Sequence, residues 1–500
     1  MLRERVKGEI IVEKQRLQMP APTLIKIIVC LAIIVAFWLL PAPAPMTAIG
    51  MKVIGVFIGT IVLLSTVDTV WPAILAVALL SRTGVATLNE AIAGTLGNWI
   101  VYFVLMSFCM TYALNKSGFT DRLVAKFMSM KFVSKSPWTF TFSMATIGLI
   151  LACFMDQVPA AAFMLMFSNK VFEELGYSKK DAYPHLANVL VIFAVNIGGA
   201  MTPISHSLAL LGMGIAEGAG HAISLFQYLA FGVPTGLVAY IVLLVLARLM
   251  GGKTDMSKFE NFDVQRVLKK QEKMQAREIV TVVVFFGTVV MWMLPGIAAM
   301  FAPDAQWIKT LNGYGITFWA IISVVLMSVI SVNNEPVINL KEVFNKNTNW
   351  GILVFIAIGC YLGSALSNGA TGINDWITTN LTPITEALPP LAVVVIITLA
   401  GVLLTNFASN VSTITVMTGV GVALALASNG AINPAGIALC TTMAGSCAFL
   451  MPSSFATVAM LHGNEWSNSK KVYVYGIIMM IVASVAIGIV GYSVGCAITG

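Results

Sequence analysis

The sequence predicts an all-α integral membrane protein with about eleven transmembrane helices and two re-entrant helical hairpins. Three observations indicate this class. Of the 500 residues, 58% are hydrophobic and 10% are charged, whereas a soluble domain carries roughly 25% charged residues. Apolar runs of about 20 residues, long enough to cross a bilayer as helices, recur along the whole chain. The same polar interruptions of these runs appear twice, about 250 residues apart.

The apolar runs predict the elements in order. Single spans lie near residues 23–42, 46–66, 68–95, 98–115, 184–215, 226–250, 278–303, 313–331, 350–369, 433–462 and 472–497. Two further apolar regions, 138–173 and 389–427, are interrupted by polar residues near their centres. We predict that each of these two regions forms a hairpin that enters and leaves through one face of the membrane.

The interruptions occupy corresponding places in the two halves of the chain. Asn98-Trp99 returns as Asn349-Trp350. The segment 154–159 corresponds to 407–412, and 196–203 corresponds to 445–452. Duplicated hydrophobic segments with interrupted helices are typical of secondary transporters.

The basic residues predict the orientation, because Lys and Arg accumulate on the cytoplasmic side of a membrane. With a cytoplasmic N-terminus, most of the 29 basic residues fall in inner segments. Arg82 and Lys309 fall outside, and Lys52 lies near the outer end of its span. The basic loops all stay on the cytoplasmic side only if the two hairpins enter the membrane from opposite faces. We therefore predict that the two halves are inverted repeats. The net charge of +7 therefore requires no nucleic-acid partner.

The predicted organisation has four parts. Residues 1–45 hold an amphipathic segment over 1–18 and the first span; residues 46–250 form the first repeat, with hairpin 138–173 and broken helix 184–215. Residues 251–277 form a cytoplasmic linker. Residues 278–500 form the second repeat, with hairpin 389–427 and broken helix 433–462. We expect a multi-pass protein in the lipid bilayer of the cell inner (cytoplasmic) membrane.

The sequence shows no motif for enzymatic or ATP-driven chemistry. The seven cysteines lie in apolar spans without metal-ligand spacing, and we interpret them as small packing residues. Neither a His-Glu-x-x-His helix nor a phosphate-binding loop is present in the sequence. We therefore predict that the protein is not an enzyme, that it uses no cofactor, and that an ion gradient supplies its energy.

The interruptions concentrate the polar chemistry. A helix break in a membrane is tolerated only where its backbone is buried in protein or lines a wet cavity. The N-terminus of a half-helix suits an anion, and exposed carbonyl oxygens suit a small cation. The second hairpin tip and its facing break supply hydroxyl, amide and backbone groups from Ser409, Asn410, Ser412, Thr413, Ser446, Cys447, Ala448 and Ser453.

The first hairpin tip differs because it carries an acid, Asp156, beside Gln157. An Asp in the middle of a transmembrane helix costs about 2.5 to 3.5 kcal/mol, so we expect it to be paired, protonated or bound to a cation. The facing break supplies Asn196, Gly198, Gly199, Thr202 and His206. One interpretation is a proton-coupled cycle that uses Asp156 and His206. The other is that His206 only forms hydrogen bonds in helix packing.

These residues resemble the divalent anion:sodium symporter family, within the larger ion transporter superfamily. Members carry Ser-Asn-Thr at the tips of two oppositely inserted hairpins, each facing a broken helix. The resemblance covers nearly the whole chain. It implies a homodimer, with a scaffold part and a transport part that moves like an elevator. It also implies that each tip with its facing break holds sodium, and that Asn and Thr side chains bind a substrate carboxylate.

The tips depart from the family pattern. The second matches at Ser409 and Asn410 but has Val411 in place of Thr, and the first reads Asp156, Gln157 and Val158. With these departures, we predict cation binding, with sodium as the only metal, by Asp156, Asn196, Gly198, Gly199, Ser409, Asn410, Ser446, Cys447 and Ala448. We predict substrate binding by Gln157, Asn410, Ser412, Thr413, Thr202 and Ser453.

The predicted function is cation-coupled transport of small organic anions such as di- or tricarboxylates, with Na⁺ or H⁺ as the coupling ion. Superfamily members that exchange cations for protons, or export oxyanions, carry an Asp-Asn pair at a similar tip. The alternative is therefore a sodium/proton antiporter or an inorganic oxyanion exporter.

Overall fold

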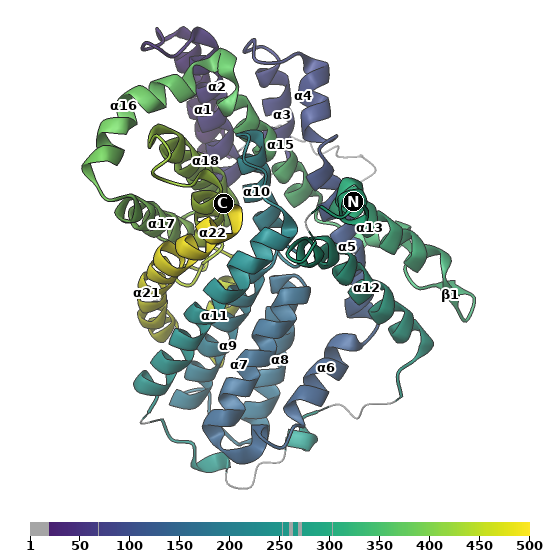
Figure 1. The fold of residues 1–500 in the computed structure, drawn as a ribbon. Coiled ribbons are helices and arrows are strands. Elements are labelled where there is room, and N and C mark those ends of the chain that lie inside the picture. Colours follow the sequence, from purple (N-terminus) through teal and green to yellow (C-terminus); the bar gives the residue numbers. More distant parts are fainter. Residues whose placement is uncertain (1–19, 69, 253, 260–263, 269–272, 303) are drawn as a thin grey trace, which may run out of the picture.

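The computed structural model describes residues 20–500 except 69, 253, 260–263, 269–272 and 303. The chain is an all-α integral membrane protein, as predicted, and Figure 1 shows its helices as one tall bundle. Within the described residues, twelve helices are long and apolar enough to cross a membrane. The strands of this part are β1 (Ser331–Val332) and β2 (Glu335–Pro336), which pair antiparallel. The predicted amphipathic segment over 1–18 lies outside the described residues.

The first helices correct one predicted span. They are α1 (Ala21–Leu39), α2 (Ala48–Thr66), α3 (Trp71–Leu80), α4 (Leu88–Thr95), α5 (Trp99–Lys116) and α6 (Phe119–Met128). The single span predicted over 68–95 is wrong, because α3 and α4 are two short helices that pack side by side (Figure 1). The chain turns at Gly84, which has a φ of 94°. Thr87 and Glu90 then form a capping box that starts α4.

A helical hairpin and a broken helix follow. The elements are η1 (Val133–Lys135), α7 (Pro137–Phe154), α8 (Gln157–Glu174), α9 (Ala182–Met201), α10 (Ser207–Gly218) and α11 (Leu225–Met250). Helices α7 and α8 both pack on α9, which is buried from Tyr183 to Met201. A helix apolar enough to be buried on every side has no lipid-facing stripe, so α9 forms the centre on which the first hairpin is placed.

The second half has the same order of elements. After η2 (Ser257–Phe259) and η3 (Val264–Arg266) come α12 (Ala276–Ala299), α13 (Gln306–Val329), α14 (Leu340–Lys346), α15 (Trp350–Ser367), η4 (Gly369–Thr371) and α16 (Ile373–Ala387). The hairpin of α17 (Pro390–Phe407) and α18 (Asn410–Ala427) precedes a broken helix of α19 (Pro434–Gly445) and α20 (Ala456–Gly463). The chain ends with α21 (Ser469–Val485), the π-helical η5 (Ala486–Gly491) and α22 (Tyr492–Thr499).

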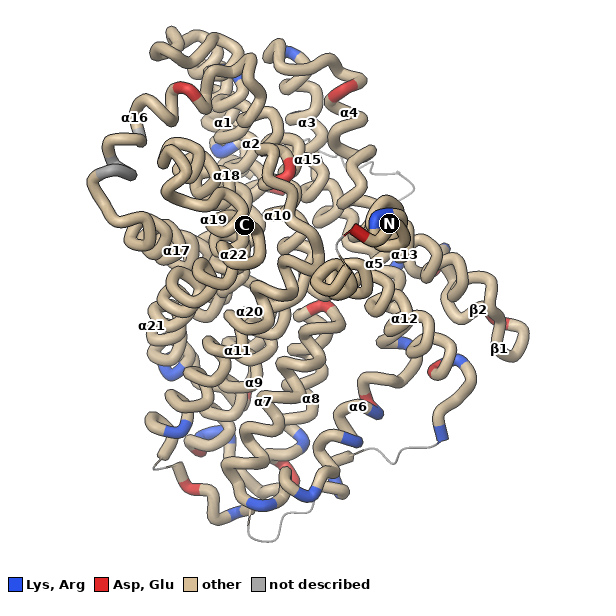
Figure 2. The backbone as a smooth tube through the Cα atoms, viewed as in Figure 1, with Lys and Arg blue, Asp and Glu red and all other residues tan. Residues whose placement is uncertain are grey.

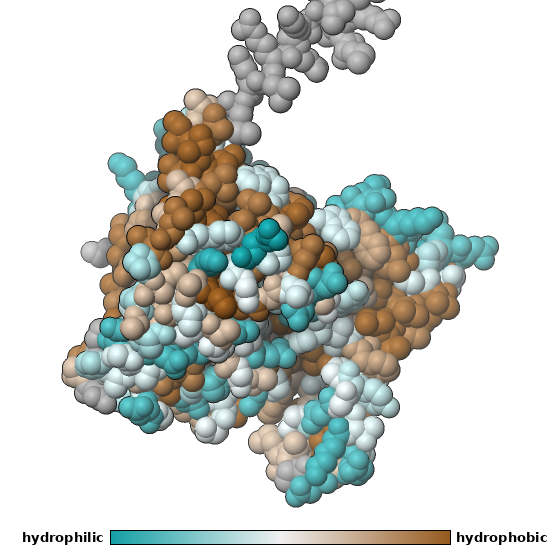
Figure 3. Space-filling view, turned by 90° about the horizontal axis from the view of Figure 1, so that it is seen from above, coloured by the Kyte–Doolittle hydropathy of each residue, from teal (hydrophilic) through white to brown (hydrophobic). Residues whose placement is uncertain are grey.

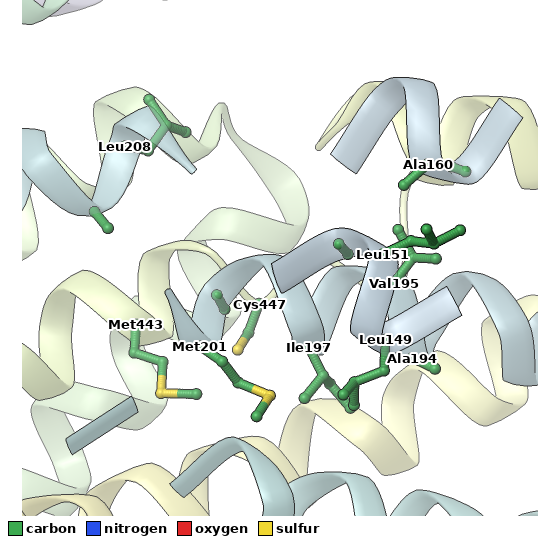
Figure 4. Close-up of a cluster of buried hydrophobic side chains, with 14 of the residues drawn as sticks. Leu149, Leu151, Ala160, Ala194, Val195, Ile197, Met201, Leu208, Met443 and Cys447 are labelled. Atoms are coloured by element: carbon green, nitrogen blue, oxygen red, sulfur yellow. The ribbon is translucent and has the colours of Figure 1, made fainter. Parts of the chain in front are cut away.

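The two halves interlock at their broken helices. Helices α17 and α18 pack on α19, and α10 from the first half packs against both α18 and α19. The core therefore runs without a gap from one half to the other. In Figure 4, the side chains of Met201, Met443 and Cys447 lie together where α9 approaches the break that follows α19. All three are buried.

Charged residues separate along the length of the bundle. Lys and Arg gather at the lower end in Figure 2, at the base of α7, α8 and α21 and around α6. The view from above in Figure 3 shows hydrophilic residues on the end face and brown, apolar residues on the flanks. Apolar flanks between polar ends are the surface that a bilayer requires.

The described part of the linker over 251–277 contacts the base of the first hairpin. Lys258 Nζ lies 3.2 Å from Asp181 Oδ2 and 2.7 Å from the carbonyl oxygen of Gly176. The N–H of Ser178 and the Lys258 ammonium lower the pKa of the Asp181 carboxyl. Arg266 also pairs with Glu174 at the end of α8, at 3.4 Å. The linker is thus attached to the hairpin by charge pairs.

Candidate substrate and cation site

The two hairpin tips begin their second helices in different ways. In the first, Asp156 is the N-cap of α8, and its Oδ1 accepts a hydrogen bond from the N–H of Val158 at 2.9 Å. In the second, Ser409 is the N-cap of α18, and its side chain makes no capping hydrogen bond. The N-terminus of α8 therefore already has a carboxyl partner within the chain, whereas the N-terminus of α18 has no side-chain partner.

The first break is tied to the hairpin by side chains. The break separates Met201 from Ser207. Thr202 Oγ1 donates to the carbonyl oxygen of Cys153 at 2.7 Å, and it also lies 3.1 Å from Ser205 Oγ. The last turn of α7 is thus joined to the residues that interrupt α9 and α10.

Gln157 lies against Gly199 of α9, and the backbone of Leu149 in α7 lies against the neighbouring Gly198. Gln157 Nε2 donates to the carbonyl oxygen of Asn196 at 3.1 Å, while its Oε1 is buried without a hydrogen-bond partner among the described residues. A Cβ on Gly199 would lie 1.9 Å from Gln157 Nε2, and a Cβ on Gly198 would lie 2.3 Å from Leu149 O. Only glycine at position 199 permits this close approach. In this position Gln157 Oε1 stays free to bind a cation.

The second break is organised by Asn406, a residue absent from the prediction. Its Oδ1 accepts hydrogen bonds from the N–H groups of Phe449 and Leu450, at 2.7 and 2.8 Å. Its Nδ2 donates to the carbonyl oxygen of Cys447 at 3.0 Å. One side chain in α17 thus satisfies three backbone groups of the break between α19 and α20. The sequence feature that could have predicted this role is the position of Asn406 within an apolar run, three residues before Ser409 at the tip.

The tip of the second hairpin holds polar atoms that lack partners. Thr405 Oγ1 lies 2.8 Å from Asn410 Oδ1 and 2.6 Å from the carbonyl oxygen of Gly445, and its single proton is shared between these two acceptors. Asn410 Nδ2 and Thr413 Oγ1 are buried without hydrogen-bond partners among the described residues. Ser412 hydrogen-bonds through its hydroxyl to Ser65 of α2. Two potential donors therefore remain unused in the first turns of α18.

The two breaks contact each other directly. Asn196 Nδ2 donates to the carbonyl oxygen of Ala448 at 2.8 Å, and Thr457 Oγ1 donates to Asn196 Oδ1 at 2.6 Å. His206 Nε2 lies 3.1 Å from Ser446 Oγ. Ser446 also points its hydroxyl at the carbonyl oxygen of Thr442, at 3.1 Å. Because that hydroxyl has one proton, a Ser446 that donates to Thr442 receives its other hydrogen bond from His206 Nε2.

Asp156 also borders a small cavity that contains hydroxyl groups. The hydroxyl-bearing residues around it are Ser107, Thr111, Ser205 and Ser207. None of the residues that line this cavity is basic. The carboxylate therefore faces neutral oxygen atoms from α5 and from the first break, a set that suits a hard cation.

The structure thus brings most of the predicted site residues into one region. Asp156, Gln157, Asn196, Gly198, Gly199, Thr202 and His206 lie around the first tip and break, and Ser409, Asn410, Ser412, Thr413, Ser446, Cys447 and Ala448 lie around the second. Ser453 is exposed in the second break, and within the described part of the chain its side chain makes no hydrogen bond to the other predicted site residues. Within the described residues, no group of three or more His, Cys, Asp or Glu side chains could hold a metal ion.

Comparison with known proteins identifies the family of the chain. A family model for the sodium:sulfate symporter transmembrane region matches residues 21–498. The chain belongs to this family. This match confirms the resemblance to divalent anion:sodium symporters. The protein is therefore a transporter and not an enzyme.

Relatives of this symporter-family chain have names that specify a substrate class. The sodium-dependent dicarboxylate transporter SdcS of Staphylococcus saprophyticus is 24% identical over 418 residues, which cover 81% of this chain and 78% of the relative. SdcS of Staphylococcus aureus strain NCTC 8325 is 21% identical over 469 residues, which cover 91% and 87%.

A solved structure has a similar fold. The Alcanivorax borkumensis YdaH transporter, described as having an unusual topology, superposes with a TM-score of 0.57 at 13% identity. The match covers 94% of this chain and 98% of the YdaH chain. This likeness concerns the fold alone.

Proposed function

We propose that the chain is a sodium-coupled symporter of small organic anions that bear carboxylate groups, in the cytoplasmic membrane. One observation carries the proposal: the two tips hold buried polar atoms of opposite character without partners. The first tip offers an acceptor, Gln157 Oε1, and the second offers donors, Asn410 Nδ2 and Thr413 Oγ1. An acceptor suits sodium, and donors suit a carboxylate.

The relatives support the choice of substrate and ion. They are named for sodium dependence and for dicarboxylates, which favours sodium over the proton and carboxylates over inorganic anions. Sodium prefers several neutral oxygen ligands, and this chain supplies amide, hydroxyl and backbone oxygens at both breaks.

Coupling follows from electrostatics. Moving an anion through the low-dielectric interior of a membrane is costly unless a counter-charge accompanies it. Sodium at the tips offsets the charge of the bound anion, so the loaded site moves at a lower cost than the anion alone. Because Asn196 and His206 join the two breaks, both tips and both breaks would move as one body.

We extend the proposal to the assembly and its motion. The hairpins with α9, α10, α19 and α20 would form a transport part that moves as an elevator against a scaffold. Two copies would associate through their scaffolds as a homodimer of inverted-repeat chains. The end rich in Lys and Arg in Figure 2 would face the cytoplasm. The basic residues among the first 16 favour the same side for the N-terminus.

Uptake into proteoliposomes tests the function. Vesicles with purified protein receive a labelled carboxylate mixture that includes succinate, malate and lactate, under an inward sodium gradient, an inward proton gradient or no gradient. We expect the sodium gradient alone to accelerate uptake, and protein-free vesicles to show none of this acceleration. Acceleration by the proton gradient instead would identify the proton, and not sodium, as the coupling ion. If neither gradient accelerates the uptake of any carboxylate, the proposal is rejected.

A further inference from the structure

The two hairpin tips differ in how the N-terminus of the second helix is capped. The N-terminus of α8 is capped by the side chain of Asp156, which accepts from the N–H of Val158 at 2.9 Å. The N-terminus of α18 has no side-chain cap, although Ser409 occupies the corresponding position. A helix N-terminus attracts one anion with its free N–H groups and partial positive charge. That attraction is used by the chain itself at the first tip and is unused at the second.

Unpartnered side chains at the second tip point to a ligand there. Asn410 is 2% exposed and Thr413 is fully buried, yet Asn410 Nδ2 and Thr413 Oγ1 have no hydrogen-bond partner among the described residues. Buried donors without partners are costly, and a carboxylate accepts hydrogen bonds from both. The first turns of α18 are therefore suited to one substrate carboxylate.

The first tip lacks the means to bind a second carboxylate. Gln157 presents an oxygen atom, not an N–H, because its Nε2 is used by the carbonyl oxygen of Asn196. Asp156 adds two carboxyl oxygens, and the cavity that it borders has no basic side chain in its lining. A second carboxylate placed here would meet acceptor oxygens without a compensating cationic side chain and, where Asp156 is ionised, a like charge.

We propose that Asp156 occupies the place of a second substrate carboxylate, so that this carrier takes small monocarboxylates in preference to dicarboxylates. The inference rests on the proposed function and narrows its substrate class. The substrate carboxylate binds at Asn410 and Thr413, and the end of the substrate without a charge faces Asp156 and Gln157. Asp156 is thus a specificity-determining residue.

Two substrates that differ in one carboxylate test the inference. Malate and 2-hydroxybutyrate both have four carbons and a 2-hydroxyl group, and we compare their sodium-driven uptake in proteoliposomes. The wild-type protein should prefer 2-hydroxybutyrate by roughly tenfold or more in kcat/KM, equivalent to about 1.4 kcal/mol. Asp156→Asn, which keeps a capping oxygen but removes the charge, should reduce this preference by a similar factor through improved use of malate.

A matched variant and a binding measurement complete the test. Asp304→Asn removes an exposed carboxylate, 97% accessible and paired with Lys309, and should leave the preference unchanged. If Asp156→Asn does not fold, thermal stabilisation of the wild-type protein in sodium decides: 2-hydroxybutyrate should stabilise it more than malate at equal concentration. A wild-type preference for malate would overturn the inference alone, whereas no sodium-driven uptake of any carboxylate would overturn the proposed function as well.

Discussion

Asn196 and Ala448 join the two helix breaks: Nδ2 of Asn196, in α9, donates to the carbonyl oxygen of Ala448, in the break after α19, at 2.8 Å. The two residues lie in different halves of the chain, and Asn196 is 1% exposed. The same side chain accepts from Thr457 Oγ1 at 2.6 Å. A backbone carbonyl that no helix can satisfy is thus satisfied by the other half of the molecule.

Asn196→Ala should destabilise the protein and impair transport together. The substitution leaves the carbonyl of Ala448 and the hydroxyl of Thr457 buried without partners, at a cost of about 2 to 4 kcal/mol. Thermal unfolding in detergent and sodium-driven uptake measure the two effects. Thr457→Val removes only one of the bonds and should cost less. Equal unfolding temperatures for Asn196→Ala and the wild-type protein would contradict the bridging role.

Asn406→Leu should disorganise the second break. The Leu side chain cannot accept from the N–H groups of Phe449 and Leu450, so the residues at the proposed cation site would lose their positions. We expect lower thermal stability and loss of stabilisation by sodium. Asn380→Leu is the control, because Asn380 is exposed in α16 and its Nδ2 bonds a carbonyl four residues earlier, as Asn406 Nδ2 also does. A similar effect of both variants would argue against a special role for Asn406.

Gly199→Ala should displace Gln157 from α9. The new methyl group would lie 1.9 Å from Gln157 Nε2, closer than any real contact. We expect sodium-driven uptake to fall by about tenfold or more, equivalent to at least 1.4 kcal/mol in kcat/KM. Gly287→Ala in α12 serves as the control, since a Cβ there meets no atom within 4 Å. Normal uptake by Gly199→Ala would show that Gln157 need not hold its observed position.

Replacing sodium with choline should lower the unfolding temperature of the wild-type protein. An ion that binds only the folded state stabilises it by about 2.7 kcal/mol at a hundred times its dissociation constant. Asn410→Ala should reduce this dependence, because Asn410 is buried at the second tip, where its Oδ1 lies 2.8 Å from Thr405 Oγ1. A titration with sodium chloride at constant ionic strength measures the effect. Identical unfolding temperatures in sodium and choline would count against a sodium site at this tip.

The prediction from sequence was most successful where lipid makes polar groups costly. Asp156 and Asn410 stood out because they interrupt apolar runs, and the structure places both where a hairpin turns. The span predicted over 68–95 was wrong because its apolar residues continue through a turn, and the weak signals of Gly84 and the capping box at Thr87 and Glu90 were missed. Asn406 was missed because its partners lie more than 40 residues away.

Composition and the spacing of apolar runs were enough to predict a helical membrane protein with two interrupted hairpins, because burial in lipid constrains the composition of each local segment. The packing of the helices in three dimensions was needed to show which tip faces which break, and that Asn196 in one break hydrogen-bonds to Ala448 in the other. It also decided that Asp156 caps α8 while the N-terminus of α18 stays open. Hydrogen-bond partners far apart in sequence depend on how helices pack, and no local pattern specifies that packing.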